Sequence, residues 1–392
     1  MKQALICPVC GSRESEIFLE RKNVVIHQHL VMKSPNTAHN VDRGNLTLAC
    51  CRDCAFIFNS TFEPAKLVYG ELYENSQTCS TFFNDYIDGL ISYLIEGKNV
   101  QDCRIIEVGC GQGIFLKRLI ERGTGNYGYG FDPSYRGPKT TEDGRLSFFK
   151  TYYGPGCANI DADVVICRHV IEHVPDPVAL LKSINKALCH SPNARLFIET
   201  PCVEWILRNE VFWDFFYEHC SYFTAGSLAR AAEAAGFAVK NVCPKFNGQY
   251  LWLEAAISGD EKSVALPPEH IPSLAKQFAA REKRLITKWS DVIKAKSAQG
   301  EIIAVWGAGA KGVTFVSLID PECQYLNCVV DINPKKQGNF IPGTGHQIVD
   351  VAALTERKIS SVILMNPNYR EEVMEMVKGL SSHITFVEME NI

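Results

Sequence analysis

The sequence predicts an α/β protein built on parallel sheets, preceded by a small cysteine-bearing module. Strand-like and helix-like patterns alternate between Gln101 and Glu199, which is typical of a parallel sheet covered by helices. A glycine-rich turn follows an apolar run at two places in the chain, and two cysteine pairs lie within the first 54 residues. The length of 392 residues leaves room for two or three domains.

The composition favours a soluble protein that acts on a small molecule. Apolar residues make up 46% of the chain and charged residues 21%, which is typical of globular proteins. Forty basic against 44 acidic residues give a net charge of −4, so no basic excess favours nucleic acid or an anionic membrane. No apolar run reaches the ~20 residues of a membrane helix, and the apolar stretch at the N-terminus is too short for a signal peptide. We expect a cytoplasmic location; the oligomeric state is open.

The N-terminal cysteines form two pairs, Cys7-Pro-Val-Cys10 and Cys51-Arg-Asp-Cys54, with 40 residues between them. Each C-x2-C turn lets two thiolates converge on one ion, and two such turns complete a tetrahedral four-sulfur shell for Zn²⁺. In a reducing compartment a metal is favoured over disulfides, and a redox pair is the alternative. Because four thiolates leave no open position on the ion, the zinc would be structural.

The first glycine-rich turn, Glu107-Val-Gly109-Cys110-Gly111-Gln-Gly113, lies between a strand-like run at 104–108 and a helical pattern at 114–120. Its glycines permit a tight turn and a close approach of the backbone to a ligand. The N-terminus of the helix offers N–H groups to an anion. Asp132 follows 19 residues after Gly113, at the end of the next strand. An acid at that place can accept both hydroxyls of a ribose.

The second turn, Gly307-Ala-Gly309-Ala-Lys311-Gly312, follows the apolar run 302–306 and precedes Asp331 by 19 residues. This spacing fits a dinucleotide-binding fingerprint, so an NAD-dependent oxidoreductase is one alternative. Only 80 residues remain after Gly312, about half of a full dinucleotide fold. Lys311 places a cation where a phosphate or carboxylate of a substrate could lie. The other interpretation is that the glycines only permit close helix–strand packing.

The first turn resembles motif I of the class I S-adenosylmethionine-dependent methyltransferases. Asp132 matches their ribose-binding acid, and Cys167-Arg168-His169-Val-Ile-Glu172-His173 resembles the segment after their fourth strand, which lines the cofactor pocket. The resemblance implies a Rossmann-like class I methyltransferase core with S-adenosylmethionine as its cofactor. It implies that the cofactor is bound by Glu107, Gly109, Cys110, Gly111, Gly113, Asp132, Arg168 and His169.

The flanking segments narrow this resemblance. The cysteine pairs precede the core, Phe216-Tyr217-Glu218-His219 follows it, and a run from Asp331 to Gly343-Thr344 lies near the end. This order resembles the three-domain sugar C-methyltransferases, which methylate carbon 3 of nucleotide-linked 4-keto sugars for antibiotics and surface polysaccharides. It implies a zinc-binding module at 1–65, a methyltransferase domain at 66–258 and a C-terminal Rossmann-like α/β domain at 259–392. We expect a linker helix over 271–297, where apolar residues recur at helical spacing.

Carbon methylation sets requirements on the site. A proton α to the ketone must be removed, which needs a general base and a group that stabilises the enolate oxygen. The resemblance implies that His219 is the base and that Glu218 orients or polarises it. The further catalytic candidates are a hydroxyl from Tyr217, a polar contact from His173, and a tyrosine folded over the site, Tyr73.

One departure from the family leaves the acceptor open. The sugar enzymes have Tyr-His-Glu-His where this chain has Phe216-Tyr217-Glu218-His219, so the first hydroxyl and the first imidazole are missing. An O-methyltransferase acting on a sugar or another small-molecule hydroxyl is therefore an alternative, with His219 deprotonating the alcohol. A zinc-bearing binding module whose core has lost activity is another.

Overall fold

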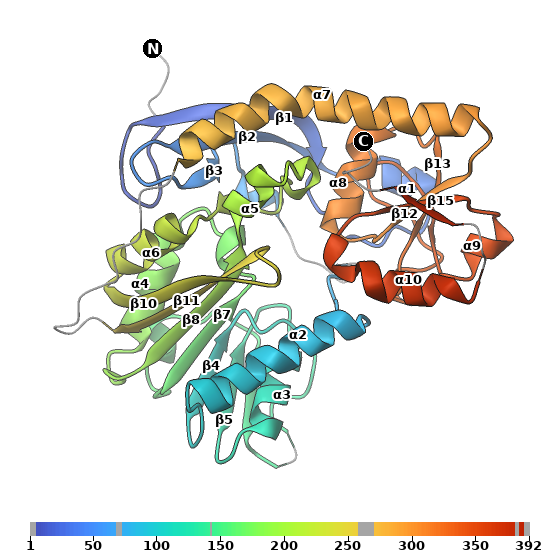
Figure 1. Ribbon diagram of the computed structural model, residues 1–392. Helices are drawn as coiled ribbons and strands as arrows, with labels where there is room; N and C mark the ends of the chain where they lie inside the picture. Colours follow the sequence, from blue (N-terminus) through green and yellow to red (C-terminus); the bar gives the residue numbers. More distant parts are fainter. Residues whose placement is uncertain (1–4, 68–72, 142, 258–269, 381–383, 388–392) are drawn as a thin grey trace.

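The computed structural model describes residues 5–67, 73–141, 143–257, 270–380 and 384–387. They form three sheets, arranged as an N-terminal, a central and a C-terminal unit (Figure 1). The expected boundary between residues 258 and 259 lies outside the described residues, and the other domain boundaries remain predictions.

The N-terminal sheet is antiparallel and is completed by a strand from far along the chain. Its order is β1-β2-β3-β9, with β1 at Ser15–Val25, β2 at Arg43–Cys51, β3 at Ile57–Asn59 and β9 at Ser221–Tyr222. The short helix α1, Pro35–His39, lies between β1 and β2. Because β9 begins two residues after His219, the N-terminal sheet fixes the end of the predicted catalytic segment.

The central sheet has the order β10-β11-β8-β7-β4-β5-β6. The five strands from β8 to β6 are parallel, and β11 runs antiparallel to both β8 and β10. The strand bounds are β4 Arg104–Val108, β5 Tyr127–Phe131, β6 Leu146–Phe149, β7 Val164–Arg168, β8 Arg195–Pro201, β10 Phe237–Lys245 and β11 Tyr250–Ile257. The helices are α2 Thr81–Ser92, α3 Ile114–Arg122, α4 Pro177–Ala187, α5 Val203–Arg208 and α6 Ala225–Ala234.

The strand order positions the site. The chain runs outward from β4 through β5 to β6 and then returns to β7 on the other side of β4. Ligands of open α/β sheets bind at such a reversal, outside the carboxyl ends of the strands. The first glycine-rich turn follows β4 and the segment from His169 to His173 follows β7, so both predicted cofactor segments lie at this edge. The strands and the helix expected between residues 101 and 199 are confirmed.

The C-terminal sheet is parallel, in the order β14-β13-β12-β15-β16. Its strands are β12 Ile303–Trp306, β13 Leu326–Val330, β14 Ile348–Val349, β15 Ser361–Leu364 and β16 Thr385–Val387, and its helices are α8 Ala310–Ile319, α9 Ala353–Glu356 and α10 Arg370–Lys378. The second glycine-rich turn joins β12 to α8.

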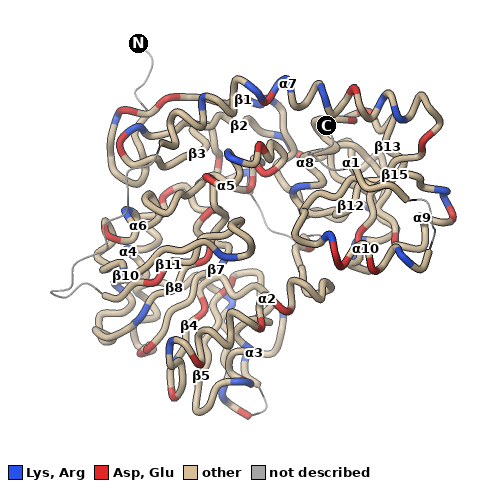
Figure 2. The backbone as a smooth tube through the Cα atoms, in the orientation of Figure 1, with Lys and Arg blue, Asp and Glu red and all other residues tan. Residues whose placement is uncertain are grey.

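Helix α7, Ile271–Ala298, confirms the helix expected over 271–297. It packs against β1 and β2 at one end and against β12 and α8 at the other, so it joins the N-terminal and C-terminal units (Figure 1). Phe278, Trp289 and Ile293 are buried on its inner side. Charged residues, most of them lysine or arginine, recur along the helix (Figure 2), as expected for a solvated outer face.

A core shared by the three units holds the segment that leads to the catalytic candidates. The ring of Trp213 meets Trp289 edge-on at 6.0 Å between centroids, and Trp289 meets Phe315 at 5.1 Å. Buried Arg21 on β1 donates to the carbonyl oxygens of Phe212 and Phe215, at 2.7 Å each. Residues 212–215 are therefore fixed by both neighbouring units, just before Glu218 and His219.

Within the ranges that the structure describes, no helix combines the length and the apolar character needed to cross a membrane.

Candidate active site

The four N-terminal cysteines converge as their spacing predicts. Cys7 Sγ lies 3.6 Å from Cys54 Sγ, and Cys10 Sγ lies 3.6 Å from Cys51 Sγ. All four sulfurs lie within 4.8 Å of one another, and none is in a disulfide. Zn–S bonds of ~2.3 Å place the sulfurs of a tetrahedral site about 3.8 Å apart. The donor set and its spacing therefore fit a structural zinc ion.

The backbone around the cysteines supports this assignment. After the first pair, Gly11 adopts φ 73° and donates its N–H to the carbonyl of Cys7 at 2.9 Å. After the second pair, Ala55 adopts φ 60° and donates to the carbonyl of Cys51 at 3.0 Å. A left-handed conformation costs a residue with a side chain ~1–2 kcal/mol, so its surroundings must enforce it. Gly11 adopts it without this cost, and a metal bound by Cys51 and Cys54 would enforce it at Ala55.

Among the three glycines of the first glycine-rich turn, only Gly111 borders open space. A Cβ on Gly109 would lie 2.2 Å from Val170, and one on Gly113 would lie 2.3 Å from Phe148. Gly111 has φ 54°, and a Cβ there would meet nothing within 4 Å. Its N–H donates to Asp132 at 2.9 Å, so the open space adjoins the predicted ribose-binding acid. The turn forms a cradle of backbone and carboxylate that a nucleoside could fill.

Three other predicted cofactor residues differ in what their side chains do. Asp132 is oriented by a second set of bonds, since its Oδ1 accepts from the N–H and hydroxyl of Ser134. Cys110 is buried and packs against Gly130, and its N–H and carbonyl bond to Phe131 and Gly113, so it shapes the turn from within. Glu107 is buried, and its Oε2 has no hydrogen-bond partner. Burial raises the pKa of Glu107 to about 8. A carboxyl oxygen without a partner beside an open cradle fits a ligand with an ammonium group and a ribose, such as S-adenosylmethionine.

Glu107 gives a prediction about pH. A carboxyl whose pKa rises from 4.5 to about 8 on folding loses stability as pH climbs through that window, by at most ~1.4 kcal/mol per pH unit. We therefore expect Glu107→Gln to be more stable than the unsubstituted protein at pH 9, with the advantage shrinking towards pH 4.5. Urea denaturation at several pH values measures this, and binding of S-adenosylhomocysteine should weaken in the same variant. A stability difference that does not change with pH would contradict the buried, protonated state.

Arg168 and His169 take part in a buried charge cluster at the end of β7. Arg168 Nε donates to Glu199 Oε2 at 2.7 Å, and the hydroxyl of Tyr86 donates to the other oxygen. Burial opposes ionisation of Glu199, yet Arg168 and His169 lower its pKa to about 2. Burial likewise opposes charge on His169, but Glu172 and Glu199 raise its pKa to about 9. His169 is therefore an imidazolium at neutral pH, and the Arg168 guanidinium is held by Glu199.

The structure brings Tyr73 and Glu218 together. The Tyr73 hydroxyl donates to Glu218 Oε2 at 2.7 Å, and the N–H of Gln28 donates to Oε1 at 2.5 Å. Glu218 is fully buried. Its backbone carbonyl lies 3.0 Å from His173 Nδ1. Glu218 therefore holds Tyr73 through its carboxylate and His173 through its carbonyl, whereas the sequence led us to expect it to act on His219.

His219 and His173 lie side by side. Their ring centroids are 4.8 Å apart and the rings are nearly perpendicular. One carboxylate oxygen of Glu172 and one ring nitrogen each of His173 and His219 lie within 4.8 Å of one another. Burial, and after it the neighbouring His173, lowers the pKa of His219 well below its usual value. His219 is therefore neutral near pH 7, which is the state that a general base requires.

Two predicted residues have other contacts. Tyr217 is buried against Gly44 of the N-terminal sheet, and its oxygen accepts from the N–H of Glu63 at 3.0 Å. These contacts indicate a packing role and not a hydroxyl at the histidines. Lys311 lies 2.8 Å from Asp214 and donates to Gln249 at 3.2 Å, so it links the C-terminal unit to the central one. Its predicted role in substrate binding remains a prediction.

Sequence reasoning missed several residues of this site. Glu172 and Glu199 are buried carboxylates that set the charge of His169. His29 comes from the N-terminal unit, and its ring centroid lies 5.4 Å from that of Tyr73. Glu172 follows His169 within the quoted motif, so its spacing could have indicated it. No local signal points to His29, because it reaches the site only through the packing of the N-terminal unit.

Comparisons with known proteins agree with this arrangement. A family model described as "Methyltransferase domain" matches residues 80–242, and one described as "C-methyltransferase C-terminal domain" matches residues 261–387. The first covers the central sheet up to β10, and the second covers α7 and the C-terminal sheet.

Two curated relatives match parts of the chain. The C-methyltransferase NovU of Streptomyces niveus is 26% identical over 229 residues, which are 55% of this chain and 54% of NovU. A ubiquinone biosynthesis O-methyltransferase of Idiomarina loihiensis is 31% identical over 127 residues, or 30% of this chain and 46% of that protein. The chain thus spans about half the length of these curated relatives. Among solved structures, a magnesium protoporphyrin IX methyltransferase from Synechocystis aligns over 48% of this chain and 91% of its own, with 17% identity and a TM-score of 0.34.

Proposed function

Because this chain belongs to the S-adenosylmethionine-dependent methyltransferases, with a Rossmann-like class I core, we propose that it methylates a carbon atom of a nucleotide-linked keto sugar. The similarity to a C-methyltransferase over 229 residues and the match to a C-methyltransferase C-terminal domain support carbon as the acceptor. The similarities to O-methyltransferases cover 127 and 155 residues, fewer than the 229 residues shared with the C-methyltransferase, and we take them to support the cofactor and not the acceptor.

The observation that carries the proposal is the pair of a neutral base and a fixed cation at one edge of the sheet. His219 is unprotonated near pH 7, and His169 is protonated and close enough to lower the pKa of His219 further. Proton abstraction next to a ketone needs this combination, because negative charge moves to the ketone oxygen as the proton leaves.

The residues then have distinct tasks. S-adenosylmethionine, when bound, supplies an electrophilic methyl group, and the cradle at Gly111 with Asp132 and Glu107 would hold it. His219 accepts the proton from the carbon next to the ketone onto a ring nitrogen. His169 offsets the charge that develops on the enolate oxygen. The hydrogen bond from the Tyr73 hydroxyl to Glu218 and the packing of the His29 ring against Tyr73 help to exclude water from the carboxyl edge of the central sheet.

We also propose that Cys7, Cys10, Cys51 and Cys54 hold a structural zinc ion. The equal 3.6 Å sulfur–sulfur distances of the two opposite pairs and the constrained turns after each cysteine pair support it. The zinc would have no part in the reaction, since four thiolates fill a tetrahedral shell.

Calorimetric titration with S-adenosylhomocysteine and with NAD⁺ tests the cofactor. We expect one molecule of S-adenosylhomocysteine per chain and no heat from NAD⁺. Gly111→Ala should lose most of this affinity, because its Cβ would enter the open cradle. Gly144→Ala is a matched control, since Gly144 also has positive φ and open space but lies between β5 and β6, away from the turn. Tight NAD⁺ binding without S-adenosylhomocysteine binding would instead support the oxidoreductase alternative.

A further inference from the structure

Tyr73 reaches Glu218 from a segment without regular secondary structure. Its only ladder contact among the described residues is an isolated bridge to Leu30, and α2 does not begin until Thr81. A tyrosine on such a segment loses its position unless something outside the segment holds it. The residue beside it, Glu74, supplies such contacts.

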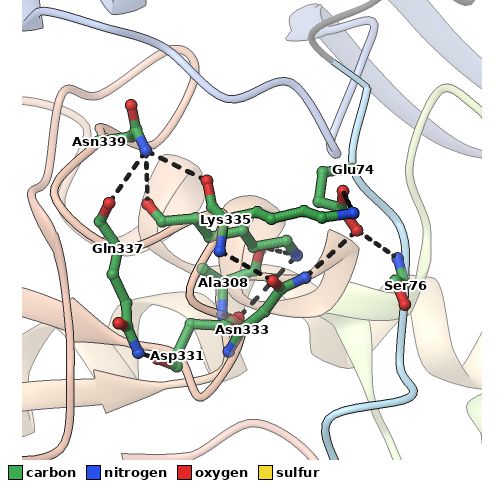
Figure 3. A network of polar contacts seen from close by, with 9 residues as sticks. Glu74, Ser76, Ala308, Asp331, Asn333, Lys335, Gln337 and Asn339 are labelled. Atoms are coloured by element: carbon green, nitrogen blue, oxygen red, sulfur yellow. Dashed lines mark hydrogen bonds and ion pairs between the residues drawn. The ribbon is translucent and has the colours of Figure 1, made fainter.

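Glu74 ties this segment to the C-terminal unit (Figure 3). Its Oε1 accepts from the side-chain amide of Asn333 at 3.3 Å and from the N–H of Ser76 at 3.2 Å. Its Oε2 lies 3.2 Å from Lys335 Nζ. Its N–H donates to the carbonyl of His29 at 2.9 Å. One side chain and one backbone group thus connect all three units next to Tyr73.

The partner of Glu74 is itself rigidly placed. The N–H of Asn333 donates to Asp331 Oδ1 at 2.8 Å, and Asp331 Oδ2 accepts from the N–H of Ala308 at 2.8 Å. Buried Lys336 donates to the carbonyl of Ala308 at 2.9 Å. Asn333 is therefore fixed to the second glycine-rich turn, and Figure 3 shows this chain of contacts ending at Glu74. The Lys335 side chain is 73% exposed, so its ion pair contributes little beside the buried Asn333.

We propose that Glu74 is a positioning residue through which the C-terminal unit holds the Tyr73 hydroxyl on Glu218. The inference rests on the proposed function for its effect on turnover, but the contact itself stands on the geometry alone. The second glycine-rich turn then contributes to the reaction without binding a dinucleotide. The turn and Asp331 hold Asn333 in place, and the side-chain amide of Asn333 holds Glu74.

A double-mutant cycle with Tyr73→Phe tests this role. We expect Glu74→Ala to lower kcat about 10-fold with little change in KM for S-adenosylmethionine. In the Tyr73→Phe background the same substitution should lower kcat less than 2-fold, because the hydroxyl it positions is already gone. Glu74→Gln should retain most of the activity, since its amide oxygen can still accept from Asn333. Asn333→Ala should reproduce the effect of Glu74→Ala.

A matched control is Glu372→Ala, since Glu372 on α10 anchors the far end of the same segment. It accepts from the hydroxyl of Ser80 and the N–H of Thr81, each at 2.6 Å. Its effect should be the same with and without the Tyr73 hydroxyl. Equal effects of Glu74→Ala on kcat in both backgrounds would overturn the inference.

The same cycle followed by urea denaturation separates the inference from the proposed function. If Glu74 positions the Tyr73 hydroxyl, Glu74→Ala should shift the urea midpoint less in the Tyr73→Phe background than in the unsubstituted protein. An unsubstituted protein that transfers no methyl group would contradict the proposed function only, and the denaturation cycle would still decide the inference. Additive midpoint shifts overturn the inference whether or not turnover is seen.

Discussion

Replacing His219 with alanine is expected to lower kcat by ~10²–10⁴-fold, the range that a positioned general base contributes. The side chain is half-buried beside His173, and desolvation and that neighbour lower its pKa so that it is neutral near pH 7. Exchange of the proton next to the ketone of the proposed substrate with solvent deuterium should fall in parallel, because His219 is the base that we propose for its removal. NMR of the keto sugar in D₂O measures the exchange without any methyl transfer.

The controls for this prediction separate chemistry from folding. Binding of S-adenosylhomocysteine should be unchanged in His219→Ala, because the proposed cofactor cradle at Gly111 follows β4 and His219 is not part of it. His190→Ala, at an exposed histidine after α4, should behave as the unsubstituted protein. If His219→Ala exchanges the proton at the normal rate, another group is the base.

Disrupting the proposed zinc site is expected to have the second large effect. Cys51→Ser should abolish stoichiometric zinc and lower the free energy of unfolding by more than ~4 kcal/mol, the range typical of losing a structural metal. We expect a large effect because Cys51 ends β2, and the N-terminal sheet continues from β2 through β3 to β9. Since β9 begins two residues after His219, we also expect activity to fall without any change at the histidine itself. Elemental analysis and urea denaturation measure the two effects.

A neighbouring cysteine provides the matched control for the zinc prediction. Cys50 is buried beside Cys51, but its Sγ lies 3.7 Å from the Cys51 carbonyl oxygen and outside the four-sulfur cluster. Cys50→Ser should therefore keep its zinc. Protein that purifies without metal and unfolds at the same urea concentration as Cys51→Ser would show that the four thiols need no ion.

The sequence predicted the local features of this fold correctly. The strand before each glycine-rich turn and the helix over 271–297 are present. The four cysteines converge, because two C-x2-C turns leave few other ways to place their thiols. These features depend on short-range geometry, which residue spacing encodes directly.

Long-range contacts account for what the sequence did not indicate. Lys311 pairs with Asp214 and Tyr217 packs on Gly44, two contacts that their motifs did not indicate. The orienting contact of Glu218 runs to Tyr73 and not to His219. Each of these partners is more than 90 residues away along the chain. No local pattern specifies such a pair, because it forms only when two independently folded faces meet.

By itself, then, the amino-acid order determined the α/β class, the two glycine-rich turns, the thiol cluster and the motif that carries His219. The tertiary structure decided which acids surround the histidines, that β9 joins the N-terminal sheet, and that Glu74 meets Asn333. The physical reason is that backbone conformation is set over a few residues, whereas the charge state of His169 and the position of Tyr73 depend on side chains that three packed units bring together.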